Sequence, residues 1–67
     1  MDERKELGKM CDRITAFFQT HKAVKVFTVE QEAAIPTSTL AKFLSGERGL
    51  TVENARKVIA TLQKYGL

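Results

Sequence analysis

The sequence predicts an all-α fold, a compact bundle of four or five helices forming one domain over residues 1–67. Two observations carry this prediction. Apolar residues recur at spacings of three and four along two long segments, as on the buried stripe of an amphipathic helix. Capping residues, a proline and glycines divide the chain into four helical segments, two long and two short. The chain has 67 residues, which is enough for one domain and too few for two.

The first and last helices are the long ones. The first is expected over residues 3–21, with Asp2 as its cap and acidic residues in its first turn, where the helix dipole favours them. The last is expected over residues 52–64, with Thr51 as its cap and Gly66 just beyond its end. Their apolar stripes predict the core: Leu7, Met10, Cys11, Ile14, Phe17, Phe18, Val52, Ala55, Val58, Ile59, Leu62 and Tyr65.

Two short helices are expected between the long ones. One spans residues 27–34, capped by Thr28, and ends before Pro36, which disfavours helical backbone in the residue preceding it. The other spans residues 37–45 and stops at Gly46, since glycine is common just past helix ends. Its cap chemistry comes from three small polar residues, Thr37, Ser38 and Thr39.

Charge and residue usage narrow the class of protein. The net charge is +3, and residues 22–67 hold seven of the bases and four of the acids, which favours a polyanionic partner. No segment approaches the roughly 18 consecutive apolar residues of a membrane span, and no apolar signal-peptide core follows the charged start. The single cysteine, Cys11, cannot form an internal disulfide, which fits a reducing compartment. We therefore expect a cytoplasmic protein without a membrane partner.

The chain offers little for catalysis or metal binding. Cys11 and His21 are the single cysteine and histidine, so a zinc site of the usual four ligands cannot be assembled from them. No nucleophile and base are suitably spaced, and a chain this short offers little concave volume for a substrate. We therefore expect no enzyme activity, no small-molecule substrate, no cofactor and no metal. Cys11 is expected in the core, and His21 as a cation at a helix C-terminus.

The two short helices have the form of a helix-turn-helix. In that motif the first helix braces against the DNA backbone, and the second lies in the major groove with its N-terminal residues at base edges. The second helix then needs small polar residues at its start, apolar residues facing inward and a base facing outward. The chain supplies Thr37, Ser38 and Thr39 for the first need, Leu40 and Phe43 for the second, and Lys42 for the third.

Residues 29–48, VEQEAAIPTSTLAKFLSGER, resemble the helix-turn-helix of the lambda-repressor-like (Cro/XRE-type) family. The likeness lies in the Ile-Pro turn, the Ser-Thr-Leu start of the second helix and the Ser-Gly-Glu-Arg exit. It implies a lambda-repressor-like fold and a sequence-specific transcriptional regulator of phage-repressor or antitoxin type, bound to double-stranded DNA. By position it implies base contacts from Thr37, Ser38, Thr39 and Lys42, and phosphate contacts from Arg48, Thr28, Lys25 and Lys22.

Three positions depart from the family pattern. Glu30 stands where alanine is usual, so its side chain either tilts to solvent or changes the helix packing. Ala34 stands where glycine is usual, which causes strain if that turn residue has a positive φ. Val26 stands where a polar residue often begins the first helix of the motif. The family also often has five helices, whereas this sequence indicates four.

An alternative function belongs to a different class. The chain could be a protein–protein interaction module that keeps the fold without specific DNA binding. Three acids within or beside the expected DNA face favour this alternative: Glu30, Glu32 and Glu47. For either function, Tyr65 and Leu67 have little chain left to cover them, which predicts a homodimer through the C-terminal helix. Such a dimer would read two half-sites about 34 Å apart.

Overall fold

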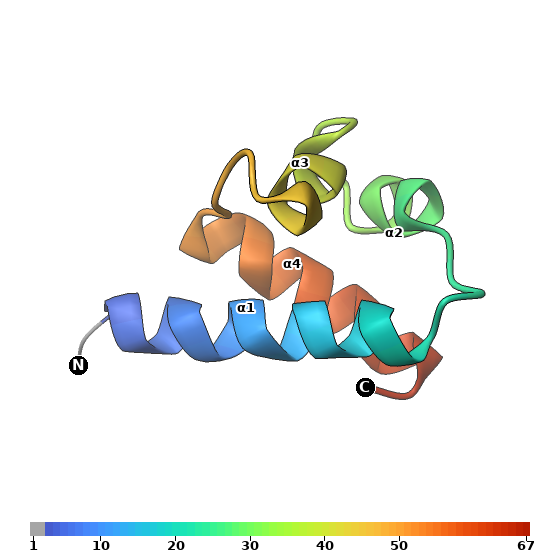
Figure 1. The fold of residues 1–67 in the computed structure, drawn as a ribbon, viewed down its shortest axis with the longest axis horizontal. Coiled ribbons are helices and arrows are strands. Elements are labelled where there is room, and N and C mark those ends of the chain that lie inside the picture. Colours follow the sequence, from blue (N-terminus) through green and yellow to red (C-terminus); the bar gives the residue numbers. More distant parts are fainter. Residues whose placement is uncertain (1–2) are drawn as a thin grey trace.

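The computed structural model describes residues 3–67, which form helices and connecting turns without a strand (Figure 1). The elements are α1 (Glu3–Thr20), α2 (Val26–Glu32), α3 (Thr39–Ser45), α4 (Val52–Leu62) and a final 3₁₀ turn, η1 (Gln63–Tyr65). The prediction of an all-α bundle with four main helices is therefore confirmed for the described residues. The predicted cap of the first helix, Asp2, lies outside them.

The long helices α1 and α4 pack against each other and carry the shorter pair (Figure 1). α2 packs on α4, and α3 packs chiefly on α2, at the edge of the molecule away from α1. The sequence explains this arrangement, because only α1 and α4 are long enough to present several turns of apolar stripe. The position of α3 therefore depends on α2.

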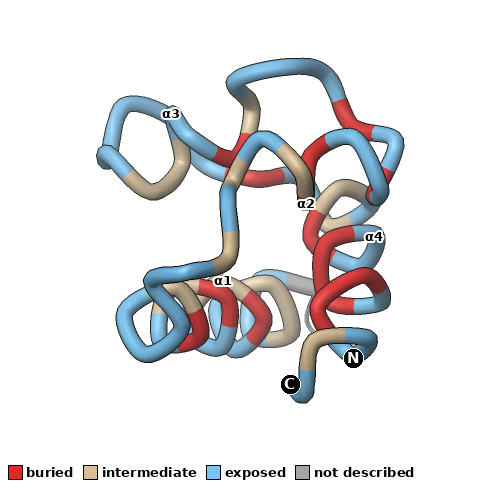
Figure 2. Tube along the Cα trace, turned by 90° about the vertical axis from the view of Figure 1, so that its right-hand side faces the viewer, coloured by how far each residue is buried: buried red, intermediate tan, exposed pale blue. Residues whose placement is uncertain are grey.

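The core lies where α1, α2 and α4 face one another (Figure 2). Its largest fully buried side chains are Ile14, Leu40, Leu62, Val29 and Val58. Burying one such side chain completely contributes about 1.5–3 kcal/mol. The periodic stripes of the sequence thus predicted the core residues of α1 and α4 well, and α2 and α3 add one fully buried residue each.

Cys11, in the middle of α1, and His21, just beyond its end, have structural roles. Cys11 is half-buried against the core, and burial, followed by the negative charge of Asp12, raises the pKa of its thiol. His21 lies just beyond α1, where its ring stacks on Phe17 at a centroid distance of 4.2 Å. Both positions are the predicted ones, Cys11 against the core and His21 at the C-terminal end of α1.

The predicted cap of α2 is wrong, although the start of the helix lies within one residue of the prediction. α2 begins at Val26, its N-cap is Lys25, and no side chain caps it by a hydrogen bond. Thr28 lies inside the first turn and is not the cap. The cause is a turn after α1, in which the Val24 N–H donates to the His21 carbonyl at 3.1 Å and leads the chain into the helix early. α2 also ends at Glu32, two residues before the predicted end.

The predicted start of α3 is also wrong. The helix begins at Thr39, so Thr37 and Ser38 belong to the preceding turn. Ser38 is the N-cap residue by position, yet its φ is 72° and its side chain makes no cap hydrogen bond. An N-cap side chain normally reaches the first turn from an extended backbone, which a left-handed residue does not have. The Leu40 N–H instead donates to Oε2 of Glu30, in α2, at 2.9 Å.

The cap of α4 is the one predicted. Oγ1 of Thr51 accepts a hydrogen bond from the Asn54 N–H at 3.1 Å. The α-helix ends at Leu62, and its last predicted turn tightens into η1. The tail then folds back, with the Leu67 N–H donating to the Leu62 carbonyl at 3.1 Å. Leu62 is fully buried, whereas Tyr65 and Leu67 are half-buried against the core.

A hydrogen bond from Tyr65 to Glu32 makes stability depend on pH. The Tyr65 hydroxyl donates to Oε2 of Glu32 at 2.8 Å, and this bond, then burial, then the charge of Glu32, raise the pKa of Tyr65 above its usual 10.0. The folded chain thus favours the neutral phenol. The contribution of the neutral phenol to the free energy of unfolding is complete at pH values below the pKa of Tyr65 in the unfolded chain. It is lost as the pH rises through the higher pKa of Tyr65 in the folded chain.

We therefore expect the wild type to lose more thermal stability than Tyr65→Phe between about pH 9 and about pH 12. Thermal unfolding followed by circular dichroism measures the difference. The phenylalanine variant keeps the aromatic ring and every other charged residue, so it isolates the phenol. Parallel pH profiles for the two proteins would contradict this role of the Glu32 bond.

Ala34 occupies the strained backbone that the sequence indicated. Its φ is 58°, and it is exposed at the turn between α2 and α3. A left-handed backbone costs an L-residue roughly 1–2 kcal/mol, and glycine avoids this strain. Part of the gain is offset because glycine has more backbone freedom to lose on folding. We expect Ala34→Gly to stabilise the fold by about 0.5–1 kcal/mol in urea unfolding.

The matched control for this substitution is Ala60→Gly. Ala60 is also exposed but lies inside α4, where glycine costs about 1 kcal/mol. The two substitutions should therefore have opposite signs. A loss of stability in both would mean that Ala34 is not strained.

Candidate nucleic-acid interface

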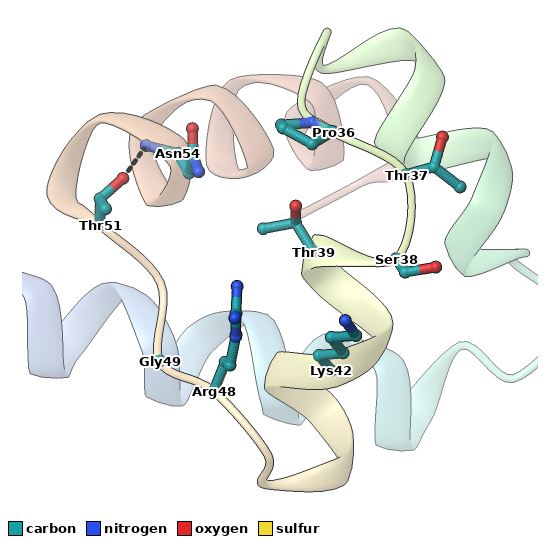
Figure 3. Close-up of a pocket in the computed structure, with 9 residues that line it drawn as sticks. All are labelled: Pro36, Thr37, Ser38, Thr39, Lys42, Arg48, Gly49, Thr51 and Asn54. Atoms are coloured by element: carbon teal, nitrogen blue, oxygen red, sulfur yellow. Dashed lines mark hydrogen bonds between the residues drawn. The ribbon is translucent and has the colours of Figure 1, made fainter.

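A groove with a volume of about 380 Å³ lies between the start of α3, the α3–α4 loop and the start of α4 (Figure 3). Its lining combines hydroxyl groups, one side-chain amide and two cations, and it includes no carboxylate. The lining residues are Pro36, Thr37, Ser38, Thr39, Lys42, Arg48, Gly49, Thr51 and Asn54.

The groove brings together five of the eight residues that the sequence predicts at a DNA interface. They are Thr37, Ser38, Thr39, Lys42 and Arg48. The other three lie elsewhere. Lys25 and Thr28 line a separate hollow of about 330 Å³ beside Tyr65, and the exposed Lys22 lines neither space.

Two polar residues of the groove were missed as site residues. Thr51 was predicted only as a helix cap, and Asn54 was not singled out. The Thr51 hydroxyl accepts the Asn54 N–H, and both side chains face the groove from the first turn of α4 (Figure 3). The cap motif alone does not predict that Thr51 and Asn54 face the groove. That position arises because the short α3–α4 loop brings the start of α4 beside α3.

The α3–α4 loop holds Arg48 in place through backbone hydrogen bonds. The Lys42 carbonyl accepts from the N–H groups of Glu47 at 2.9 Å and Arg48 at 3.3 Å. Gly46 makes this reversal feasible with its φ of 86°. The buried Leu50 anchors the other end of the loop. Arg48 extends from this fixed loop into the space between Thr39 and the start of α4 (Figure 3).

The nearby acids do not line the groove. Glu30 is only 3% exposed, and it accepts the hydrogen bond from the Leu40 N–H. Glu32 accepts from the Tyr65 hydroxyl at 2.8 Å. Glu47 is exposed in the loop but is not among the lining residues. The three acids that favoured a protein partner in the sequence therefore do not neutralise the groove directly.

The groove has the chemistry of an anion-binding surface that can also read polar edges. Lys42 and Arg48 are exposed, and neither forms an ion pair within residues 3–67. Cations of this kind bind phosphate oxygens or the acceptors of guanine, while hydroxyl and amide groups bind phosphates and several base edges. The left-handed Ser38 leaves its hydroxyl outside the α3 cap, where it is available for such contacts.

Two further features are absent from the residues that the structure describes. In that part of the chain, no group of three or more His, Cys, Asp and Glu residues is placed to hold a metal ion. No described helix combines the length and the apolar character that crossing a membrane requires.

No protein-family model, curated protein or solved structure matches this chain. The resemblance of residues 29–48 to the lambda-repressor-like family therefore stays a prediction, carried by the residues themselves.

Proposed function

We propose that the protein is a sequence-specific, DNA-binding transcriptional regulator of phage-repressor or antitoxin type. In this proposal α2 and α3 act as a helix-turn-helix, and α3 enters the major groove of double-stranded DNA. The observation that carries the proposal is the carboxylate-free groove, in which hydroxyls, an amide and two cations from three segments converge. Base edges flanked by phosphates present the complementary set of acceptors and donors.

Each side of the groove has its own role in the proposal. Thr37, Ser38, Thr39 and Lys42 lie on the α3 side and would contact bases. Arg48, Thr51 and Asn54 lie on the side of the loop and α4 and would contact the adjoining phosphates. Lys25, Lys22 and Thr28, near the start of α2, would contact phosphates farther along the strand.

The proposal includes a homodimer through the C-terminal helix. One module offers few base contacts, each worth roughly 1–3 kcal/mol, so two modules on half-sites about 34 Å apart bind far better than one. Tyr65 and Leu67 are half-buried within the chain, which leaves part of each for a second copy. Sedimentation at high protein concentration tests this, and a strictly monomeric protein would remove the dimer from the proposal.

One observation favours the protein–protein interaction module instead. Phe27, at the start of α2, is 54% exposed and is the large hydrophobic residue that stands out to solvent among those described. Aromatic side chains of this kind are common anchors of protein interfaces. A single exposed aromatic residue is, however, ordinary on a soluble protein, so we rank this function second.

Selection of binding sites from random double-stranded DNA tests the proposal against this alternative. We expect the wild type to enrich one common sequence and to elute from heparin only at raised salt. A Phe27→Ser variant should enrich the same sequence, because Phe27 does not line the groove. Failure to enrich any sequence, together with no retention on heparin, would contradict DNA binding and leave the interaction module.

A further inference from the structure

Glu30 is a buried acid in the middle of α2. It is 3% exposed, and its Oε2 accepts the N–H of Leu40, ten residues away, at 2.9 Å. Burying a carboxylate is costly unless hydrogen bonds satisfy it. Within residues 3–67, no buried side-chain nitrogen or oxygen lacks a hydrogen-bond partner. The hydrogen bond from the Leu40 N–H therefore compensates for burying the Glu30 side chain at a position where an apolar residue would need no partner.

The same bond replaces the ordinary cap of α3. Leu40 is the second residue of the helix, so its N–H is one of the four first-turn donors without a helical acceptor. Serine at the N-cap position normally accepts such a donor. Ser38 occupies that position but has a φ of 72° and makes no cap hydrogen bond. The carboxylate of Glu30 performs the task from the neighbouring helix.

The position of α3 also depends on this contact. α3 packs chiefly on α2, and Leu40 is the fully buried side chain that joins α3 to the core. The hydrogen bond to Glu30 fixes the backbone of that residue. Its neighbours on the N-terminal side, from Thr37 to Thr39, form the α3 side of the groove.

We propose that Glu30 is a positioning residue for the DNA interface. By capping α3 in place of Ser38, its carboxylate holds the turn before α3 in the left-handed form and keeps the Ser38 hydroxyl free for DNA. This inference rests on the proposed function. Without the acceptor, Ser38 is placed to move to an extended backbone and cap α3 itself, which relieves its strain and withdraws its hydroxyl from the groove.

The test compares Glu30→Met with Glu30→Gln. Both variants remove the charge and roughly keep the side-chain length, but only glutamine keeps an oxygen that can accept the Leu40 N–H. We expect Glu30→Met to bind the duplex enriched by the wild type about tenfold more weakly, as loss of one base contact would predict. Its binding to a scrambled duplex should be unchanged, because Lys42 and Arg48 remain. Glu30→Gln should keep most of the discrimination.

Nuclear magnetic resonance supplies a readout that needs no DNA. In the wild type, the Leu40 amide should be protected from hydrogen exchange, and the Cα shift of Ser38 should report a left-handed backbone. In Glu30→Met, that shift should move toward an extended backbone. An extended Ser38 with a rapidly exchanging Leu40 amide in the wild type would overturn the proposal, even if Glu30→Met fails to fold.

The outcomes separate the two proposals. A wild type that enriches no duplex contradicts the proposed function, and with it the positioning role. A wild type that enriches a duplex, with a folded Glu30→Met that discriminates equally well, contradicts the positioning role alone. Equal losses in Glu30→Met and Glu30→Gln would also overturn it, because the charge and not the cap would then be responsible.

Discussion

Lys42→Ala is expected to weaken binding to the enriched duplex by about 5- to 150-fold and to relax the base preference at one position. The lysine is exposed on α3 and lines the groove, and loss of a base contact costs roughly 1–3 kcal/mol. Alanine is a better helix former than lysine, so helicity should persist. Titration of labelled duplexes with single base changes measures both effects.

Arg48→Ala should behave differently, because Arg48 is predicted to contact a phosphate. Binding should weaken on all duplexes alike, and the dependence of log affinity on log salt should lose about 0.9 units of slope. The matched control is Lys5→Ala, which removes the same charge from the exposed face of α1. If Lys5→Ala weakens binding as much as Lys42→Ala or Arg48→Ala does, the net charge of the protein and not the groove governs binding.

Leu40→Ala is expected to cause the largest loss of stability. Leu40 is fully buried, and truncating such a leucine typically costs 2–5 kcal/mol. A chain of this size is stable by roughly 3–10 kcal/mol in total, so the loss is a large part of it. At about 4–8 °C per kcal/mol, the melting temperature should fall by more than about 8 °C.

Leu44→Ala provides the control in the same helix. Leu44 is half-buried, so the same change of side chain removes less buried surface. Thermal and urea unfolding should show a clearly smaller loss than for Leu40→Ala. Equal losses would mean that α3 is not anchored to the core through Leu40.

The long helices could be predicted from the sequence because their signals are local. The stripe of α1 runs from Leu7 to Phe18, about three helical turns, and the cap of α4 joins Thr51 to a residue three positions away. Both features are visible in a short window of sequence. Their cores and their boundaries therefore followed within a few residues.

The caps of α2 and α3 could not be predicted in this way. The sequence around Ser38 reads as cap chemistry, but the cap of α3 comes from Glu30, in another helix. For Glu30 the sequence predicts either a tilt to solvent or a change in helix packing, and its burial contradicts the first of these. The left-handed Ala34 was foreseen because glycine is usual at that turn.

The candidate site followed the same division. The residues on the α3 side of the groove, including Lys42, and Arg48 in the loop were predicted from one continuous segment of sequence. The structure places all of them in one groove. Thr51 and Asn54 join that groove only through the path of the chain, which composition and spacing do not reveal. Lys25 and Thr28 lie at a different hollow, because the start of α2 is set by the turn after α1.

The shortness of α2 and α3 has a consequence for the order in which the molecule opens. Each has seven residues, well below the length at which a helix persists alone in water. The bond between Glu30 and Leu40 ties them together. We therefore expect residues 26–45 to unfold locally as one cooperative unit while α1 and α4 stay paired. If the proposed function holds, DNA bound to this least stable part should slow its hydrogen exchange the most, since a ligand that binds the folded form stabilises it.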